Sequence, residues 1–282
     1  MIEIENVSKK YADKVAVNNV TFSVEEGEIF GLLGPSGAGK TSLIKIITTQ
    51  IKHDTGHIKV MGKRIEKWKA EDNVKLGIMT EGFGLYDRLT CCENIRFYER
   101  IFQLPENTGS KLIEEVGLAD AMDKRVSELS KGMRQRLSFV RAIINSPQLL
   151  FLDEPTSDLD PISTERIHEI IKMLRKQGTT VFLSTHDMSE ATKLCDKIGL
   201  LNHGGLIEYG DPHILCTGYN SENMITIIDK KGVSRTIENR PENAEMFCEY
   251  FKNNNVISIK SSEMNLEQLF IKLTSEKGGT IE

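Results

Sequence analysis

The sequence predicts an α/β protein whose central sheet is substantially parallel. Short stretches rich in β-branched residues alternate with segments of helical periodicity through most of the chain. One apolar stretch, residues 28–34, ends in glycine, and a segment with apolar residues at helical spacing follows at 41–51. Further buried strands are predicted at 149–152 and 179–185. Strands that alternate with helices in this way predict helices layered on a sheet.

The domain organisation follows from length and from changes in pattern. A chain of 282 residues exceeds the usual length of one domain, so we expect a large domain with a smaller appendage. We place the large domain at residues 1–218, with a mostly helical insert at about 82–146, where strand signals fade. Residues 219–282 are predicted to form a small α/β appendage: a hairpin, a helix, a strand and a last helix.

Two helix starts can be read from their capping residues. Thr90 and Glu93 fit a capping box at the start of a helix in the insert. Asp160 and Pro161 suit the N-cap and the first position of a later helix.

Composition excludes several classes of protein. Hydrophobic residues make up 39% and charged residues 27% of the chain, which is typical of globular proteins and not of disordered or fibrous ones. The formal charge of −5 comes without a block of lysine and arginine, so we expect no nucleic-acid partner. No apolar run approaches the ~20 residues that cross a bilayer, and the first residues do not resemble a secretory signal. The five cysteines are odd in number and lack CxxC spacing, which favours reduced thiols in a cytoplasmic protein.

The strongest motif is GPSGAGKT, which matches the P-loop pattern G-x-x-x-x-G-K-[ST] between a predicted strand and a predicted helix. Glycines let the backbone wrap so that N–H groups and the helix N-terminus point at phosphate oxygens. Lys40 would add a cation for the β and γ phosphates, and the Thr41 hydroxyl would bind Mg²⁺. The alternative, a chance glycine turn, is disfavoured by the context. The candidate phosphate-binding residues are Gly34, Pro35, Ser36, Gly37, Ala38, Gly39, Lys40, Thr41 and Ser42.

Two further sites follow strand ends. LLFLDEP ends an apolar strand in two carboxylates: Asp153 would hold Mg²⁺, and Glu154 would polarise the attacking water. His186 follows the strand at 179–185, at the rim where α/β sheets bind ligands, and would hold that water near the γ phosphate. The alternatives are a solvated strand end and a solvated loop histidine. With the P-loop, these residues predict a nucleoside triphosphatase.

The motif LSKGMRQR at 129–136 resembles the signature of ATP-binding cassette (ABC) ATPases. Tyr11 resembles that family's adenine-stacking aromatic residue, SDLD at 157–160 its D-loop, and His186 its switch histidine; the resemblance covers about residues 1–215. It implies a RecA-like P-loop core with an antiparallel β part and a helical insert. It also implies an ATPase that uses ATP and Mg²⁺ and is coupled to transmembrane transport.

The resemblance further implies that the protein acts as a homodimer. The Ser130 hydroxyl and the Gly132 amide, at the start of a helix, would form an anion site. Family geometry implies that this site caps the ATP of the second subunit, so that two ATP molecules are sandwiched between two subunits.

The chain departs from the family pattern at two positions. Lys131 stands where most cassettes have glycine, and we expect it to point to solvent rather than to the partner's phosphate. Glu81 stands where most have glutamine; it could bind Mg²⁺, take part in catalysis and sense the permease, or be a solvated loop residue. Beside it, the apolar residues Phe83, Leu85, Tyr86 and Leu89 either line a groove for a permease helix or pack locally.

The signature, the segment 82–98 and the ending NLEQLFIKLT resemble the subgroup that drives multidrug, bacteriocin and sodium exporters (ABC-2 type) through a separately encoded permease. This implies a cytoplasmic protein, peripheral on the inner face of the membrane. The alternatives are an importer ATPase and an ATP-switched dimerising module with little turnover; Glu154 and His186 argue against the second. A chromosome-maintenance ATPase would carry a long coiled coil between P-loop and signature, and a translation-associated protein would carry two cassettes.

Overall fold

The computed structural model describes residues 1–80, 84–220, 223–253 and 255–277. The chain divides into two units, Met1–Asp211 and Pro212–Glu282, and each is described by itself. The predicted boundary after residue 218 falls inside helix α7 (Pro212–Tyr219), which belongs to the second unit. No described helix combines the length and the apolar character that crossing a membrane requires.

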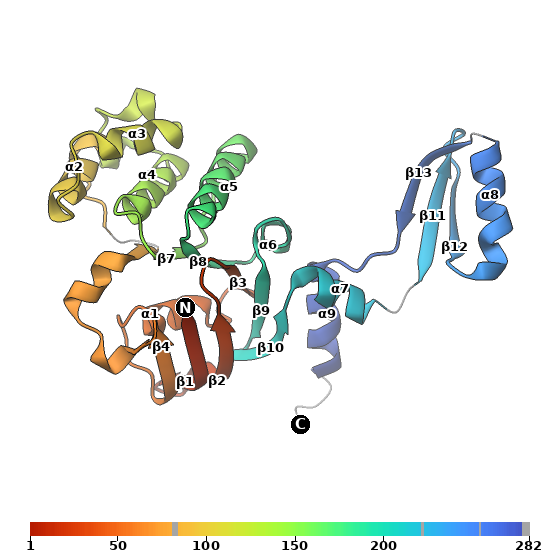
Figure 1. Ribbon diagram of the computed structural model, residues 1–282, viewed down its shortest axis with the longest axis horizontal. Helices are drawn as coiled ribbons and strands as arrows, with labels where there is room; N and C mark the ends of the chain where they lie inside the picture. Colours follow the sequence, from red (N-terminus) through yellow and green to blue (C-terminus); the bar gives the residue numbers. More distant parts are fainter. Residues whose placement is uncertain (81–83, 221–222, 254, 278–282) are drawn as a thin grey trace. The chain divides into compact units, whose positions relative to one another are not determined.

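A six-stranded sheet with the order β10-β9-β3-β8-β7-β6 forms the centre of the first unit (Figure 1). All neighbouring strands are parallel except β10 and β9. Every residue of β3, β7 and β8 is buried, as expected of parallel strands covered on both faces. The predicted α/β class with a largely parallel sheet is therefore confirmed. The strands are β3 (Ile29–Leu33), β6 (Leu76–Met79), β7 (Leu149–Asp153), β8 (Thr180–Thr185), β9 (Lys197–Asn202) and β10 (Gly205–Gly210).

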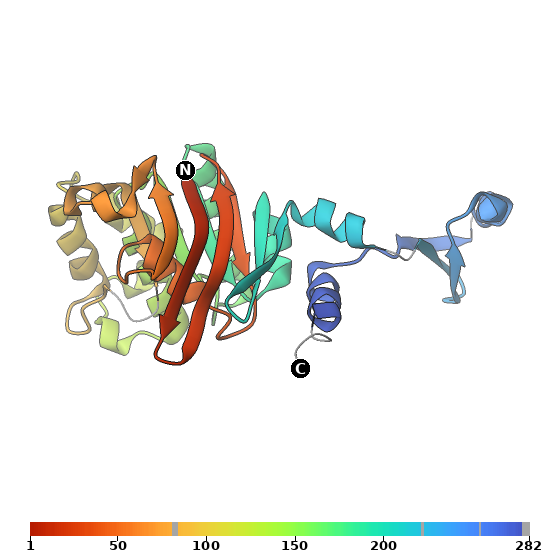
Figure 2. The same cartoon turned by 90° about the horizontal axis from the view of Figure 1, so that it is seen from below.

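An antiparallel sheet with the order β2-β1-β4-β5 forms the second layer of this unit. Figure 2 shows β1 and β2 as the long red strands. Phe22 of β2 stacks on Phe30 of β3 with ring centroids 4.9 Å apart, so one apolar core joins the two sheets. The strands are β1 (Ile2–Tyr11), β2 (Lys14–Val24), β4 (Thr55–Val60) and β5 (Lys63–Arg64).

Three helices, α2 (Cys91–Ile101), α3 (Thr108–Glu115) and α4 (Lys131–Ile143), form the helical insert between β6 and β7. The capping box is present: Glu93 N donates to Thr90 Oγ1 (3.1 Å), and Thr90 N donates to Glu93 Oε2 (2.8 Å). The remaining helices of this unit are α1 (Lys40–Ile47), α5 (Pro161–Lys176) and α6 (Met188–Leu194), with 3₁₀ turns at Ile65–Lys67, Ala70–Lys75, Ala119–Ala121 and Val126–Glu128.

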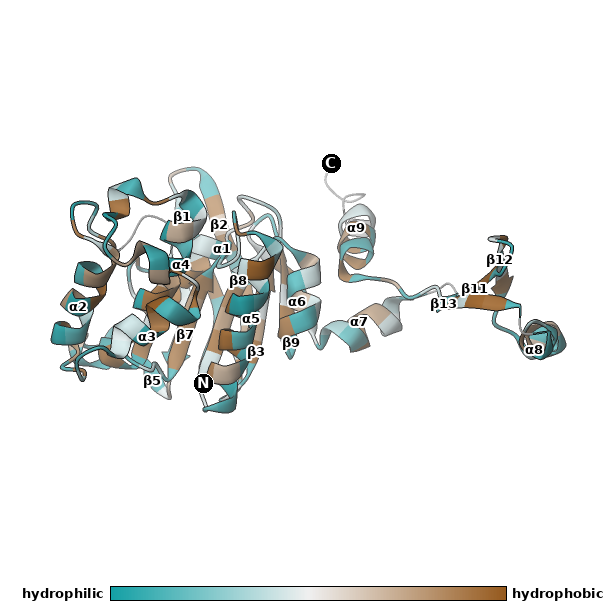
Figure 3. Cartoon of the chain, turned by 90° about the horizontal axis from the view of Figure 1, so that it is seen from above, coloured by the Kyte–Doolittle hydropathy of each residue, from teal (hydrophilic) through white to brown (hydrophobic). Residues whose placement is uncertain are grey.

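Helix α5 begins as its sequence predicts, with Asp160 as N-cap and Pro161 in the first turn. Asp160 accepts hydrogen bonds from the hydroxyl and the backbone N–H of Ser163, which hold the pKa of the Asp160 carboxyl below its ordinary value. Figure 3 shows the strands beneath the helices in apolar colours.

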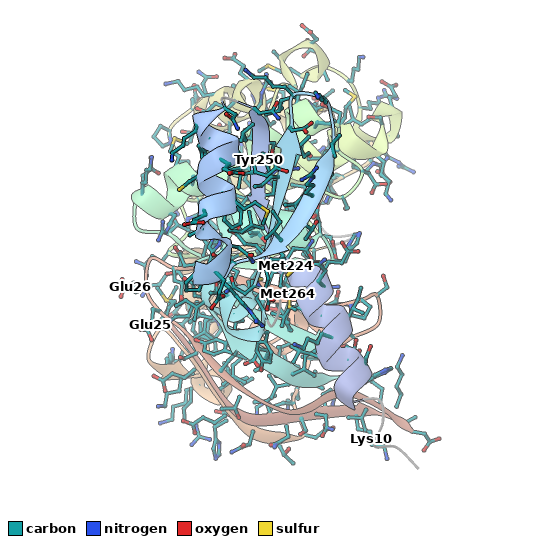
Figure 4. The ribbon with its side chains drawn as sticks, turned by 90° about the vertical axis from the view of Figure 1, so that its right-hand side faces the viewer. Lys10, Glu25, Glu26, Met224, Tyr250 and Met264 are labelled. Atoms are coloured by element: carbon teal, nitrogen blue, oxygen red, sulfur yellow. The ribbon has the colours of Figure 1, made fainter. Side chains whose placement is uncertain are left out.

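The second unit contains a three-stranded antiparallel sheet with the order β12-β11-β13. Helix α8 packs along this sheet, with Tyr250 between the two; Met224, which begins β11, lies near Met264 (Figure 4). The elements are β11 (Met224–Asp229), β12 (Ser234–Glu238), a 3₁₀ turn (Pro241–Asn243), α8 (Ala244–Lys252), β13 (Val256–Ser261) and α9 (Leu266–Lys277).

Candidate nucleotide-binding and hydrolysis site

The parallel register brings three sequence-distant loops to one edge of the large sheet. Leu33 of β3 pairs with Thr185 of β8, and Asp153 of β7 pairs with Ser184 of β8. The P-loop, Glu154 and His186 come directly after these residues, so all three lie beyond the carboxyl ends of adjacent strands. This is the edge at which α/β sheets bind ligands.

The P-loop is built from glycines that other residues could not replace. Gly39 has φ +111°, and a Cβ there would lie 2.2 Å from the Ala16 carbonyl oxygen. A Cβ on Gly34 would lie 2.2 Å from the Leu201 carbonyl oxygen. Because β2 and β9 approach so closely, the loop keeps a backbone that a side chain would disrupt.

Lys40 begins α1 and is held against the loop itself. Its side chain is only 7% exposed; Nζ donates to the Gly34 carbonyl oxygen at 2.6 Å and lies 3.4 Å from Glu154 Oε1. A buried ammonium group that faces a glycine-rich loop and a helix N-terminus suits a phosphate chain.

Asp153 is a buried carboxylate with a partner on each oxygen. Thr41 Oγ1 donates to Oδ2 at 2.8 Å, and the Ser184 hydroxyl donates to Oδ1. Two oxygen donors side by side, Thr41 and Asp153, form the kind of ligand set that Mg²⁺ prefers. The sequence indicated Thr41 and Asp153 but not Ser184, whose polar side chain near the carboxyl end of a buried strand was the available signal.

Glu154 adopts a left-handed backbone conformation, with φ +51°. Its N–H donates to the Ser184 carbonyl, and its own carbonyl oxygen accepts from Gln135 Nε2 (2.7 Å) and from Ser157 Oγ (2.9 Å). Its side chain turns to His186, with Oε2 2.7 Å from Nδ1. The backbone contacts fix where the carboxylate points, and Gln135 supplies a contact that sequence reasoning missed.

Two cavities meet at these residues. One, of about 350 Å³, is lined by Tyr11, Lys14, Ala16, Pro35, Ser36, Gly37, Ala38, Gly39, Lys40, Thr41, Ser42 and Glu154. The other, of about 250 Å³, is lined by Ser36, Thr41, Met79, Thr80, Lys131, Gln135, Asp153, Glu154, Ser157, Asp158 and His186. Ser36, Thr41 and Glu154 line both, so a phosphate chain and the hydrolytic residues would share one space.

Tyr11 lies at the wall of the larger cavity. The residue is 44% exposed, and Lys9 Nζ lies 5.5 Å from the centroid of its ring. Lys9 is fixed in turn by Asp54 at 2.7 Å. Because Tyr11 is 44% exposed, its ring keeps surface on which a base could stack. Lys14 on the same wall was not predicted.

The signature segment begins helix α4. Ser130 is the N-cap, and its Oγ accepts from Met133 N at 3.2 Å. A Cβ on Gly132 would lie 2.9 Å from the Asp158 carbonyl oxygen, so glycine allows the helix start to pack against the D-loop. Lys131 is 74% exposed and its Nζ lies 2.8 Å from Asp158 Oδ2, an ion pair within the chain that neither expectation for this residue included.

Not every predicted residue joins the cavities. Among the described residues, those that line the two cavities do not include Ser130 or Gly132. Glu81, predicted as a catalytic residue and metal ligand, and Phe83, predicted beside it, lie outside the described residues. Leu85 and Leu89 are half-buried, whereas Tyr86 is 49% exposed and meets Phe97 edge to face.

The fold and this site are those of an ABC ATPase. The sequence profile of the ABC transporter family matches residues 17–157, and the chain belongs to that family. The chain is 36% identical over 231 residues to the linearmycin resistance ATP-binding protein LnrL of Bacillus subtilis, covering 80% of this chain and 74% of LnrL. It is 33% identical over 285 residues to the fluoroquinolones export ATP-binding protein Rv2688c of Mycobacterium tuberculosis, covering 98% and 94%.

Solved structures agree with this assignment. An ATP-binding subunit of an ABC transporter superposes with a TM-score of 0.70 at 27% identity, covering 78% of this chain and 93% of that one. The dimeric post-hydrolysis state of the cassette MJ0796, bound to ADP and Pi, gives 0.68 at 26% identity, covering 75% and 98%. The predicted family, fold and ATPase activity are confirmed, and the chain binds adenine nucleotides.

Proposed function

We propose that this protein is the ATP-hydrolysing subunit of an ABC exporter and works at the inner face of the membrane on a separately encoded permease. The observation that carries the hydrolytic role is the convergence of Lys40, Asp153, Glu154 and His186 at one sheet edge. The exporter role is supported by relatives named for linearmycin resistance and fluoroquinolone export. No feature of the described residues favours an importer over this reading.

The chemistry is general-base hydrolysis at the γ phosphate. Glu154 Oε takes a proton from water, and His186 orients both that carboxylate and the water. Lys40 lies beside Glu154 Oε1, so incoming phosphate competes with the carboxylate for the ammonium group and leaves Glu154 free to act as base. Thr41 and Asp153 would hold Mg²⁺, which when bound neutralises phosphate charge; Glu81 is proposed as a further ligand and catalytic residue.

The second subunit completes the site. Ser130 and the Gly132 amide lie at a helix N-terminus, where N–H groups attract anions, yet they are not among the described lining residues of their own chain's cavities. MJ0796 is dimeric in a post-hydrolysis state bound to ADP and Pi, and we infer that this chain dimerises as well, with each signature capping the ATP held by the partner. A homodimer then contains two composite sites.

Ser130→Arg is expected to stop turnover while each free subunit still binds ATP, because the longer cation fills the space where the partner's phosphate would bind. Phosphate release from the purified protein measures this effect. Mixing with a Lys40→Ala subunit should restore activity, since the mixed dimer keeps one composite site with an intact lysine and an intact serine. Full activity of the Ser130→Arg homodimer would refute the composite site.

A matched variant separates phosphate binding from helix capping. Ser130→Asn keeps an N-cap of equal quality, whereas loss of a cap costs about 0.5–2 kcal/mol. The asparagine variant should keep the melting temperature of the wild type. If Ser130→Arg and Ser130→Asn lose turnover only in proportion to lost stability, the serine acts as a cap alone.

The permease is tested by purification from membranes. A tagged chain expressed in its native host should co-purify in detergent with a polytopic membrane protein, and that complex should hydrolyse ATP. Lys40→Ala serves as the control that still associates but does not hydrolyse. Recovery of the active protein without a membrane protein would contradict the transport role and leave the ATPase role intact.

A further inference from the structure

A buried carboxylate outside the hydrolytic residues joins the two loops that carry them. Glu190 of α6 is 2% exposed. Its Oε1 accepts from Thr156 Oγ1 at 2.7 Å and lies 3.0 Å from Nε2 of His168, which is itself 3% exposed on α5. Both partners therefore meet a single oxygen of Glu190.

Glu190 is connected to His186 through the start of helix α6. Asp187 follows the histidine and is the N-cap of α6; its Oδ1 accepts from Ser189 N (2.8 Å) and Glu190 N (3.1 Å). The position of α6 thus sets the position of the histidine backbone. Glu190, in the first turn of α6, anchors this helix to the turn after β7 through a buried polar contact.

Glu190 is connected to Glu154 through Thr156. Thr156 lies in the tight turn after Glu154, in which the Ser157 hydroxyl donates to the Glu154 carbonyl oxygen at 2.9 Å. Moving Thr156 therefore moves the left-handed turn on which the base sits. Glu190 thereby connects the two loops whose side chains meet at 2.7 Å between Glu154 Oε2 and His186 Nδ1.

Packing alone does not account for a carboxylate in this place. The other buried residues of α6 are Ala191 and Leu194, which are apolar. Burial of a charged group costs free energy unless it is fully paired, and Oε2 of Glu190 has no hydrogen-bond partner among the described residues. The contacts that the carboxylate does make, with Thr156 and His168, are therefore the feature that distinguishes this position from the apolar residues beside it.

We propose that Glu190 is a positioning residue for ATP hydrolysis, which holds the Glu154 turn and the His186 loop in register through Thr156 and His168. This inference rests on the proposed hydrolytic function. Glu190 would affect the rate of the chemical step rather than the binding of ATP. The hydrogen bonds of Lys40 with Gly34 and of Thr41 with Asp153 do not involve Glu190, Thr156 or His168.

The test measures kcat and KM for Mg-ATP in Thr156→Val and Glu190→Leu. A misplacement of about 1 Å between reacting groups costs roughly 100-fold, so we expect kcat to fall roughly 10- to 100-fold with KM little changed. Glu190→Gln keeps an acceptor for the threonine hydroxyl and should recover most of the rate. In a His186→Ala background, Thr156→Val should cause a smaller loss than in the wild type, because the Glu154–His186 contact that it positions is already gone.

Glu99→Leu is the matched control. Glu99 is also a buried carboxylate, 7% exposed on α2, and its Oε1 accepts from Gly109 N at 2.7 Å, but it contacts neither loop. It should lower the melting temperature without lowering kcat. Unchanged kcat in folded Thr156→Val, or a loss in His186→Ala that is as large as in the wild type, would overturn the proposal. Thr156→Val changes one hydroxyl only, so it decides the matter even if Glu190→Leu does not fold. A wild-type protein without turnover would instead refute the hydrolytic function.

Discussion

Replacing Glu154 with glutamine is expected to slow ATP hydrolysis by roughly 10² to 10⁴-fold, as loss of a general base does, and to leave ATP binding intact. The amide matches the carboxylate in shape but cannot accept the proton of water. The main-chain contacts of the residue, with Ser184, Gln135 and Ser157, survive the change. Its side-chain contacts with His186 and Lys40 become those of a neutral amide. Because ATP is bound but not consumed, the variant should accumulate as an ATP-bound dimer.

Phosphate release gives the rate, and size-exclusion chromatography with and without ATP gives the oligomeric state. Glu114→Gln, on the exposed side of α3, is a control of identical chemistry and should hydrolyse at the wild-type rate. Wild-type turnover in Glu154→Gln would exclude the role of the carboxylate as base.

Lys40→Ala is expected to abolish the stabilisation of the protein by Mg-ATP. A ligand present at 100 times its Kd stabilises the native state by about 2.7 kcal/mol, and this gain disappears when the ligand no longer binds. The substitution removes the cation that faces the phosphates and also leaves the Gly34 carbonyl oxygen without its 2.6 Å donor. The variant is therefore compared with itself, with and without nucleotide.

The measurement is the shift in melting temperature on adding Mg-ATP. Lys45→Ala, one turn further along α1, removes a lysine that lines neither described cavity and should keep the wild-type shift. A shift in Lys40→Ala equal to that of the wild type would contradict the assignment of this lysine to the phosphates.

Local patterns predicted the elements that carry the site. The P-loop, the strand before Asp153 and the helix starts at Thr90 and Asp160 each depend on residues that are close together in the sequence. Spacing and capping residues could therefore predict them. The predicted boundary after residue 218 stays a prediction; the contacts divide the chain after Asp211, and periodicity alone does not show where tertiary contacts end.

Contacts between distant segments could not be predicted from the sequence. Ser184 contacts Asp153 because β8 and β7 are neighbouring strands. Gln135 contacts the Glu154 carbonyl oxygen because the start of α4 packs against the D-loop. The Glu190 network depends in the same way on α5, α6 and the turn after β7. Lys131 forms an ion pair with Asp158, which is distant from it in the sequence.

The close approach of Gly132 to the Asp158 carbonyl has a consequence for a dimer with two composite sites. The helix start that we propose to cap the partner's nucleotide and the loop that follows the subunit's own Glu154 are in direct contact, and Lys131 and Asp158 form an ion pair there. We therefore expect a shift at one site to reach the other through this contact. In a dimer of this kind we expect the two sites to be coupled, so that ATP bound at one site changes the affinity of the other and turnover rises cooperatively with ATP concentration.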